Sequence, residues 1–510
     1  MSKKVFKKSK WYHKYFGLFG ILFLIEMSIS GIILNHKNLV ASIEMPHFLT
    51  PSNYDIKNFN RSAIIDLIET DNYVYIAGKK GAYRAKKADK LNFKPLFKGL
   101  SPYTIKRKSY DLQKLKDYVF LANENGLYQI TKNSDTWNRV NIGDNSIIKK
   151  IIKKDENALF ILSSSNIYLL NIKNNSSKNS KFNIKKITPK RKGDKKVTAV
   201  ELFFHLHDGS AWGLFGKLLF DLGGLAIIFL SISAFYIWFI PKRIKKRKGN
   251  LKKNRKHFKF FYQYHKKIGI YSLLVVVLIS FTAIFMRPPF IVAITDVILP
   301  RWIYPAPINQ NNWYERIENA LYDKNRDKLM IQCSDYLWSW DIKNDDFSKK
   351  AYISKQKWPL FIMGATYLEL DKDNNYIMGS FSGFYKFYPN KNKYESLIKI
   401  KNKKEYNRIK PLKHFMVAGA FKYNNQMYIA THLEGLKNLN GKSIKLFEQP
   451  KIMNEIKMPL WNWNFELHNG RILKFIIGKY YILLVPFSAI LFFLVILSGL
   501  YDWIFIIRKK

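Results

Sequence analysis

The stretch His13-Lys14-Tyr15-Phe16-Gly17 opens a long apolar run, and a similar stretch, His265-Lys266-Lys267-Ile268-Gly269, opens another run in the second half of the chain. Seventeen residues after each histidine stands a pair of small residues, Ser30-Gly31 in the first copy and Thr282-Ala283 in the second. The same phrases in the same order indicate that the chain is a tandem duplication.

A second phrase is also repeated, as Leu206–Gly209 (LHDG) and Leu467–Gly470 (LHNG), each time ahead of a long apolar run that ends near a tryptophan. Four histidines therefore recur in register: His13, His265, His207 and His468. Imidazole at a membrane edge is polar and poorly buried, so packing alone does not explain its repetition. We interpret the four histidines as ligands with a shared role.

Four apolar runs cover residues 15–34, 213–240, 268–286 and 472–500. As helices rising about 1.5 Å per residue, each run is long enough to cross a hydrocarbon core of about 30 Å. The predicted fold class is therefore a membrane α-helical protein with four spans, arranged as a tandem duplication of a two-span half.

Lysine and arginine gather before the first run, in the connector 241–264 and at the C-terminus. Under the positive-inside rule these short basic segments are cytoplasmic, so both termini lie inside and the long segments 37–205 and 288–466 lie outside. The first run has no small-x-small cleavage site after it and is predicted to be an uncleaved span. The predicted divisions are 1–36 (N-terminus and first span), 37–205 (outside), 206–240 (second span), 241–264 (cytoplasmic loop), 265–287 (third span), 288–466 (outside) and 467–510 (fourth span and C-terminus).

Composition excludes several classes of protein. The formal net charge is +49, but the basic residues are mostly lysines spread over all segments, with no zinc-finger or helix-turn-helix pattern, so no nucleic-acid partner is expected. Cys333 is the single cysteine, which excludes a disulfide framework, covalent haem attachment and an iron–sulfur cluster. A redox centre in this chain must use other ligands.

Both outer segments contain short alternating runs that predict strands joined by a Gly, Asn or Asp turn. Six predicted hairpins share this pattern: Tyr73–Arg84, Tyr118–Tyr128, Ala158–Tyr168, Leu329–Trp338, Tyr376–Tyr385 and Met427–Leu436. Within each half they recur at intervals of about 40 to 50 residues, the length of one propeller blade. The outer segments are thus β-rich, either as one propeller-like ring that both halves form jointly or as two separate β domains.

A parallel duplication relates the two halves by a pseudo-twofold axis along the membrane normal. His13 can then face His265 on the cytoplasmic side, and His207 can face His468 on the outer side. Two opposed imidazoles suit a haem iron, which takes one nitrogen on each face of the porphyrin, whereas zinc would require four ligands at each site. The sequence predicts two haem b groups whose irons these four histidines bind.

Other polar residues at the spans have open roles. His36 and His205 are reserve outer ligands, because His36 ends the first span and His205 lies beside His207. Glu26 and Asp221 lie within spans, where an ionisable group is costly, and they either form a proton or polar relay or are neutralised by protonation.

The repeated His–Gly and small-pair phrases, the two Leu-His-x-Gly phrases and the two-span halves resemble the PepSY-associated transmembrane family. That resemblance implies an inner-membrane protein linked to iron uptake, and some members are similar to dihaem cytochromes that reduce ferric siderophores outside the membrane. This chain departs from the family pattern at Thr282-Ala283, where Thr-Gly is usual, and its outer segments show no evident PepSY sequence.

The leading hypothesis is a multi-pass haem b oxidoreductase of the bacterial inner membrane. It passes electrons from a quinol or a cytoplasmic reductase to an outer acceptor such as a ferric siderophore, with the lipid bilayer as its other partner. The alternative is a non-enzymatic, membrane-anchored sensor or ligand-binding protein with an external β domain. A transporter is a third class, disfavoured because no broken span is evident in the sequence.

Overall fold

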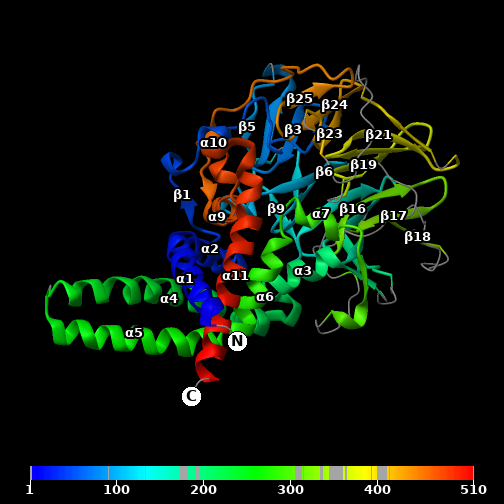
Figure 1. Cartoon of the computed structure of the whole chain (residues 1–510). Helices are drawn as coiled ribbons and strands as arrows, with labels where there is room; N and C mark the ends of the chain where they lie inside the picture. Colours follow the sequence, from blue (N-terminus) through cyan, green and yellow to red (C-terminus); the bar gives the residue numbers. More distant parts are fainter. Residues whose placement is uncertain are drawn as a thin grey trace. The chain divides into compact units, whose positions relative to one another are not determined.

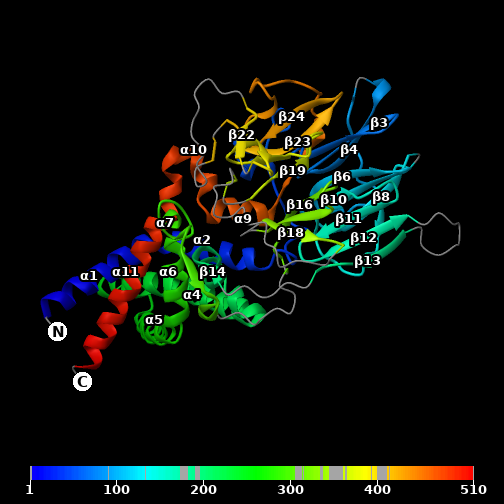
Figure 2. The same cartoon turned by 90° about the vertical axis from the view of Figure 1, so that its right-hand side faces the viewer.

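Helices and strands occupy separate blocks of the chain, as the sequence pattern predicts (Figure 1, Figure 2). The computed structural model describes residues 3–89, 91–132, 134–172, 182–189, 196–247, 249–304, 313, 315–333, 337–343, 360–361, 364–391, 393–398, 411–412 and 414–508. Lys248, Asp335, Lys509 and Lys510, which belong to the predicted basic segments and turns, lie outside these residues. The chain divides into a helical unit (Met1–Asn53, Asp194–Ile308, Pro459–Lys510) and a β unit (Tyr54–Gly193, Asn309–Met458).

The long helices of the helical unit are of two kinds, apolar and lysine-rich. The main helices are α1 (Lys3–Phe19), α2 (Ile21–Asn35), α4 (Gly213–Lys245), α5 (Leu251–Tyr271), α6 (Leu273–Ile284) and α11 (Tyr481–Ile507). Shorter helices are α3 (Ala199–His207), α7 (Phe290–Ile294), α9 (Leu460–His468) and α10 (Lys474–Ile477). Two helical stretches, Ser210–Lys245 and Arg471–Ile507, are unbroken and apolar enough to cross a membrane.

The expectation of continuous first and third spans was wrong, because each is bent. α1 and α2 meet at 62°, and α5 and α6 meet at 69°. The first bend lies at Gly20, a residue type at which helices kink readily. The second lies at Ser272, whose hydroxyl donates to the Ile268 carbonyl (2.8 Å) and so competes with the helix backbone. With two bent spans, a transporter is no longer disfavoured on the ground that no span is broken.

Helix packing in this unit follows the duplication. Within each half the bent pair packs on its own long helix, α2 on α4 and α6 on α11. Across the halves, α1 packs on α11 while α5 packs on α4, and α2 packs on α9 while α3 packs on α6. These contacts come in matched pairs, as a pseudo-twofold relation requires.

The described residues of the β unit form six antiparallel sheets. Their strands are β2 (Asp66–Glu69), β3 (Tyr73–Gly78), β4 (Gly81–Lys86), β5 (Lys94–Pro95); β6 (Ser109–Leu115), β7 (Tyr118–Asn123), β8 (Gly126–Thr131), β9 (Asn138–Val140); β10 (Ile148–Lys153), β11 (Ala158–Ser163), β12 (Ile167–Ile172), β13 (Phe182–Lys186); β16 (Ile317–Asp323), β17 (Lys328–Cys333), β18 (Leu337–Asp341); β19 (Tyr367–Leu370), β20 (Tyr376–Ser380), β21 (Gly383–Tyr388), β22 (Lys393–Ser396); β23 (Val417–Tyr423), β24 (Gln426–Thr431) and β25 (Gly435–Asn438). The six predicted hairpins are confirmed as the pairs β3–β4, β7–β8, β11–β12, β17–β18, β20–β21 and β24–β25.

Each apolar core of the β unit is shared by two sheets that follow one another in the chain. The sixth core joins the last sheet to the first, with Phe421 and Leu436 packed together with Ile64 and Ile76. Because three sheets come from each half of the chain, the two outer segments build one unit together rather than a domain each.

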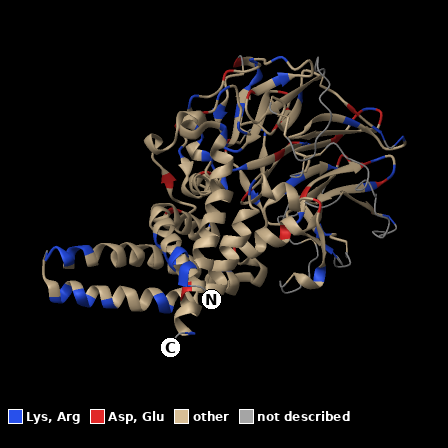
Figure 3. Cartoon of the chain, in the orientation of Figure 1, with Lys and Arg blue, Asp and Glu red and all other residues tan. Residues whose placement is uncertain are grey.

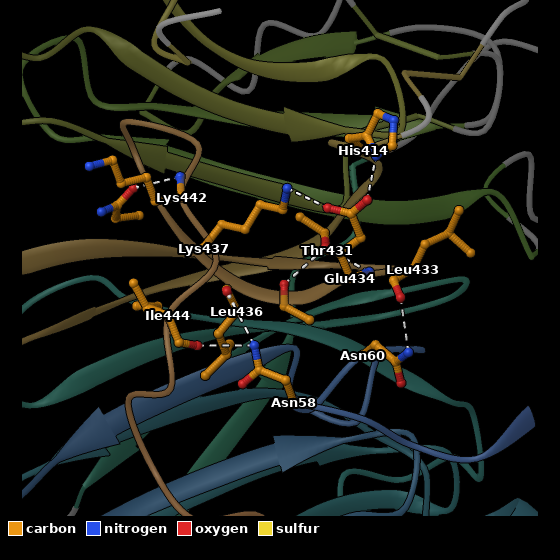
Figure 4. Close-up of polar contacts among 12 residues, drawn as sticks. Asn58, Asn60, His414, Thr431, Leu433, Glu434, Leu436, Lys437, Lys442 and Ile444 are labelled. Atoms are coloured by element: carbon orange, nitrogen blue, oxygen red, sulfur yellow. Dashed lines mark hydrogen bonds and ion pairs between the residues drawn. The ribbon is translucent and has the colours of Figure 1, made fainter.

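Hydrogen bonds also link the segment before β2 to the last sheet (Figure 4). Asn58 has φ of +49°, which asparagine tolerates better than most residues, and its side-chain amide donates to the carbonyls of Leu436 (3.4 Å) and Ile444 (3.0 Å). Asn60 donates to the Leu433 carbonyl at 3.0 Å. The first residues of the β unit are thus tied to its last strands.

Candidate functional site

The four repeated histidines meet in two pairs within the helical unit. His13 of α1 faces His265 of α5, with 6.3 Å between ring centroids and 80° between ring planes. His207, the last residue of α3, faces His468, the last residue of α9, with 6.3 Å between centroids and 54° between planes. Both pairings are those that the register of the duplication predicts, and each pair takes one imidazole from each half.

The repeated Leu-His-x-Gly phrases are helix ends. α3 ends at His207 and α9 at His468, and two residues later Gly209 (φ +76°) and Gly470 (φ +72°) adopt left-handed backbone conformations. Glycine is the residue that stops a helix in this way without strain. A Cβ on Gly209 would also lie 2.5 Å from the Gly216 carbonyl oxygen. The phrase therefore places a histidine at the helix terminus and turns the chain immediately after it.

Hydroxyl groups hold three of the imidazoles through Nδ1. The partners are Ser30 for His468 (2.8 Å), Thr282 for His207 (3.0 Å) and Ser233 for His265 (2.7 Å). Each hydroxyl also lies within hydrogen-bond distance of a backbone carbonyl in its own helix. A hydroxyl has one hydrogen, and a carbonyl can only accept, so the hydroxyl gives that hydrogen to the carbonyl and accepts from the imidazole. This arrangement favours the tautomer that carries the ring proton on Nδ1.

His13 has the same tautomer but a different hydrogen-bond partner. Its Nδ1 lies 2.9 Å from the Val495 carbonyl oxygen and 3.4 Å from the Ser498 hydroxyl. Since a carbonyl cannot donate, His13 also carries its proton on Nδ1. In all four histidines Nε2 then keeps a free lone pair, which is the tautomer that binds a metal ion.

Each imidazole is held by the half of the chain to which it does not belong. His13 is bound by α11 and His265 by α4, while His207 is bound by α6 and His468 by α2. The small pairs Ser30-Gly31 and Thr282-Ala283 thus have a function as imidazole partners, which the sequence analysis had not assigned.

Sequence reasoning missed Ser233 and Ser498. A signal was present, because each is followed by a small residue and stands five positions before a tryptophan, Trp238 or Trp503. The small neighbours matter for space. A Cβ on Gly499 would lie 2.7 Å from Cε1 of His13, closer than side chains approach, whereas a Cβ on Gly31 would lie 3.5 Å from Cε1 of His468.

The spacing of the rings fits one metal ion between each pair. Two metal–nitrogen bonds of about 2 Å, with each ring centre about 1 Å beyond its nitrogen, give a centroid separation of about 6 Å. No group of three or more His, Cys, Asp or Glu side chains that could hold a metal ion occurs among the described residues. Two axial nitrogens without further protein ligands fit haem iron, whose other four ligands are porphyrin nitrogens, and do not fit zinc.

The reserve ligands have other partners. His36 Nε2 lies 2.6 Å from Asp221 Oδ2, and the Asn35 amide donates to Asp221 Oδ1 at 2.9 Å. His205 is hydrogen-bonded through Nδ1 to the Tyr304 hydroxyl. Asp221 is therefore paired with His36. Glu26 lies one turn before Ser30 on α2, and its Oε1 is buried with no hydrogen-bond partner among the described residues.

The β unit contains a separate buried charge network. Lys150 Nζ lies 2.8 Å from Asp111 Oδ1, whose Oδ2 accepts from the Ile151 amide at 2.7 Å. Asp66 in turn accepts from the Leu112 amide at 2.8 Å. Burial raises the pKa of Asp66 well above its usual value, and the neighbouring Asp111 adds to this increase. These carboxyl groups link β2, β6 and β10, the first strands of three successive sheets, which indicates a structural role.

Comparison with known proteins adds a family and a weak structural likeness. The family described as the PepSY-associated TM region matches residues 10–504. No curated protein matches the chain. The extracellular domain of BT4673 from B. thetaiotaomicron has 11% sequence identity and a TM-score of 0.35, covering 73% of this chain and 32% of that chain. The extracellular domain of BT3049 from the same organism has 9% identity and a TM-score of 0.33, with coverage of 74% and 33%. The chain thus spans about a third of these structures.

Proposed function

Because the chain belongs to the PepSY-associated transmembrane family, we propose that it is a haem b protein of the bacterial inner membrane that passes electrons to an acceptor outside. The observation that carries this proposal is that the four imidazoles form two facing pairs, with 6.3 Å between the ring centroids of each pair. The Nδ1 atom of every ring is hydrogen-bonded to the protein. Haem bound there supplies a one-electron carrier at each depth.

The residues of the chain have two tasks in this proposal. His13, His265, His207 and His468 bind iron through Nε2. Ser30, Thr282, Ser233 and the Val495 carbonyl fix the tautomer and the ring orientation, as outer-shell partners of metal-binding histidines commonly do. The sensor alternative accounts for a β unit but gives no reason for four imidazoles held at Nδ1.

The proposed membrane arrangement has four spans, with each bent pair counted as one span beside the two unbroken ones. Lysine and arginine gather on α1 and along α5 (Figure 3). By the positive-inside rule these helices mark the cytoplasmic side, so both termini lie inside. His13 and His265 then form the inner site and His207 and His468 the outer one.

The β unit is proposed to be a six-bladed propeller on the outer side. Cores shared between successive sheets, with a sixth core that returns to the first sheet, support this architecture. It would hold the acceptor, for which the family resemblance suggests a ferric siderophore. The donor on the inner side would be a quinol or a cytoplasmic reductase.

Haem content per chain tests the proposal. The full chain, expressed with ample haem, is expected to show a Soret band and two haems per chain. His13→Ala and His468→Ala are each expected to lower this to about one, while His36→Ala, a histidine paired with Asp221, keeps two. Absence of a Soret band in the wild type, or unchanged haem content in both ligand variants, would contradict the proposal.

A further inference from the structure

The two halves differ at corresponding positions near the His207–His468 pair. Asn35 stands five residues after Ser30, and the equivalent residue in the second half is Arg287, five residues after Thr282. Asn35 is hydrogen-bonded to a carboxylate, that of Asp221. At this position the first half therefore has an amide that is hydrogen-bonded to a carboxylate, whereas the second half has a guanidinium.

A second arginine follows the histidine of the same half. Arg471 stands three residues after His468, where the first half has Ser210 after His207. Its Nε lies 3.0 Å from Glu466 Oε2 and 3.3 Å from Asn469 Oδ1, and its guanidinium lies 5.6 Å from the centre of the Phe465 ring.

Arg287 and the segment that carries Arg471 both lie against Tyr481, the first residue of α11. The Arg287 guanidinium carbon lies 5.7 Å from the centre of the Tyr481 ring. Gly470, next to Arg471, packs against the same tyrosine, since a Cβ there would lie 3.4 Å from the Tyr481 carbonyl oxygen. Arg287 also interacts electrostatically with Arg471 and Glu466.

The two arginines can still donate a hydrogen bond to a ligand. Arg287 Nε is buried and has no hydrogen-bond partner among the described residues. Among the described residues, Arg471 is paired with the carboxylate of Glu466, and the same carboxylate acts on Arg287 electrostatically, so two positive charges share one negative charge. A buried, partnerless N–H of a cation is costly unless a ligand satisfies it.

We propose that Arg287 and Arg471 form a carboxylate-binding site beside the His207–His468 pair. Guanidinium binds carboxylate through charge-assisted and often bidentate hydrogen bonds, which makes a carboxylate the best-matched ligand. The carboxylate comes either from a haem propionate, in which case the inference rests on the proposed function, or from the external acceptor.

Binding measurements on the full chain in detergent distinguish these sources. Chain produced without haem is titrated with haem, with haem dimethyl ester, whose propionates are blocked, and with ferric citrate. The variants are R287Q, R471Q and the double variant, with R287K and R471K as charge-preserving forms. Arg255→Gln in α5 removes the same charge from an exposed position elsewhere and serves as the matched control.

If propionates occupy the site, the wild type binds the ester about tenfold more weakly than haem, and the double variant binds both equally weakly. If an external carboxylate occupies it, haem and ester bind alike in every form, and ferric citrate binds about tenfold more weakly to the double variant. In both cases the lysine forms bind more tightly than the double variant but more weakly than the wild type, because lysine keeps the charge and loses the bidentate geometry.

Unchanged affinity of the double variant for all three probes would overturn the site. An effect of R255Q as large as that of the double variant would also overturn it, because net charge would then explain the result. If the wild type binds no haem, the proposed function fails, and the ferric citrate titration alone decides the carboxylate site.

Discussion

The helical unit and the β unit are both built by the duplicated halves, but they preserve different things. In the helical unit equivalent positions of the two halves keep the same kind of polar group. Histidine is equivalent to histidine, and the hydroxyl of Ser30 is equivalent to that of Thr282. In the β unit the residue that follows the register shift in the first strand of a sheet is Asp111, Lys150, Asn319 or Gly419, depending on the sheet. The β unit repeats an architecture, whereas the helical unit repeats a chemical site.

The buried ion pair of Lys150 and Asp111 should contribute most to stability, and its loss should affect the β unit alone. Lys150→Met leaves the buried carboxylate of Asp111 without its cation, and loss of one partner of a buried ion pair costs about 3–5 kcal/mol. Chemical denaturation should show this loss in unfolding free energy while the haem content per chain stays at the wild-type value. A loss below about 1 kcal/mol, within the range of surface pairs, would mean that the network is not structural.

Removal of a hydroxyl that is hydrogen-bonded to an imidazole should weaken haem binding in the helical unit. Ser233→Ala and Thr282→Val delete the hydroxyls that hold His265 and His207, and outer-shell changes of this kind typically cost about 10–100-fold in metal affinity. Haem titration measures the loss. Ser231→Ala and Ser280→Ala are matched controls, since both serines are buried in the same helices and neither binds a histidine. Equal losses in controls and variants would refute the positioning role.

The two histidine pairs differ in how much space a neighbouring glycine leaves beside the ring, and a methyl group added at that glycine tests the difference. Gly499→Ala puts a Cβ 2.7 Å from the His13 ring, so the ring must move, and haem affinity at that pair should fall by about tenfold or more. Gly31→Ala makes an ordinary 3.5 Å contact with His468 and is expected to change affinity little, as the natural Ala283 in the equivalent position suggests. Comparable losses in both variants would contradict this spacing argument.

The smallest expected effect depends on pH and is confined to the β unit. Partial burial raises the pKa of Asp371, but Lys386, at 2.6 Å, and two backbone amides outweigh it, so the pKa is lowered overall. A carboxyl with a lowered folded pKa stabilises the fold above its ordinary pKa and loses that contribution as the pH falls through the folded value.

Asp371→Asn should therefore cost about 1 kcal/mol or less at pH 7, because the pair is partly exposed, and less at an acid pH that protonates this carboxyl in the folded chain. Denaturant unfolding at the two pH values measures the difference. A cost that is independent of pH would show that the carboxylate charge contributes nothing.

The sequence predicts the repeated parts of the fold and the site well. Strand alternation and turn residues predict the six hairpins, and the register of the duplication predicts which histidines face each other. Both are local patterns that recur in each half of the chain.

Other features are less visible because they depend on tertiary contacts or on single residues. The bends at Gly20 and Ser272 do not lower the hydropathy of the runs that contain them. Ser233 and Ser498 escape notice because their spacing from the preceding histidine differs between the halves. The partners of His36 and His205 come from distant parts of the chain, Asp221 and Tyr304.

Whether haem lies between the paired histidines can be seen in an experimental density map of the full chain purified with its native pigment. The account predicts one flat density between His13 and His265 and another between His207 and His468, each contacted by Nε2 of both rings. A map in which either pair of imidazoles meets with no group between them, although the sample carries two haems per chain, would contradict it.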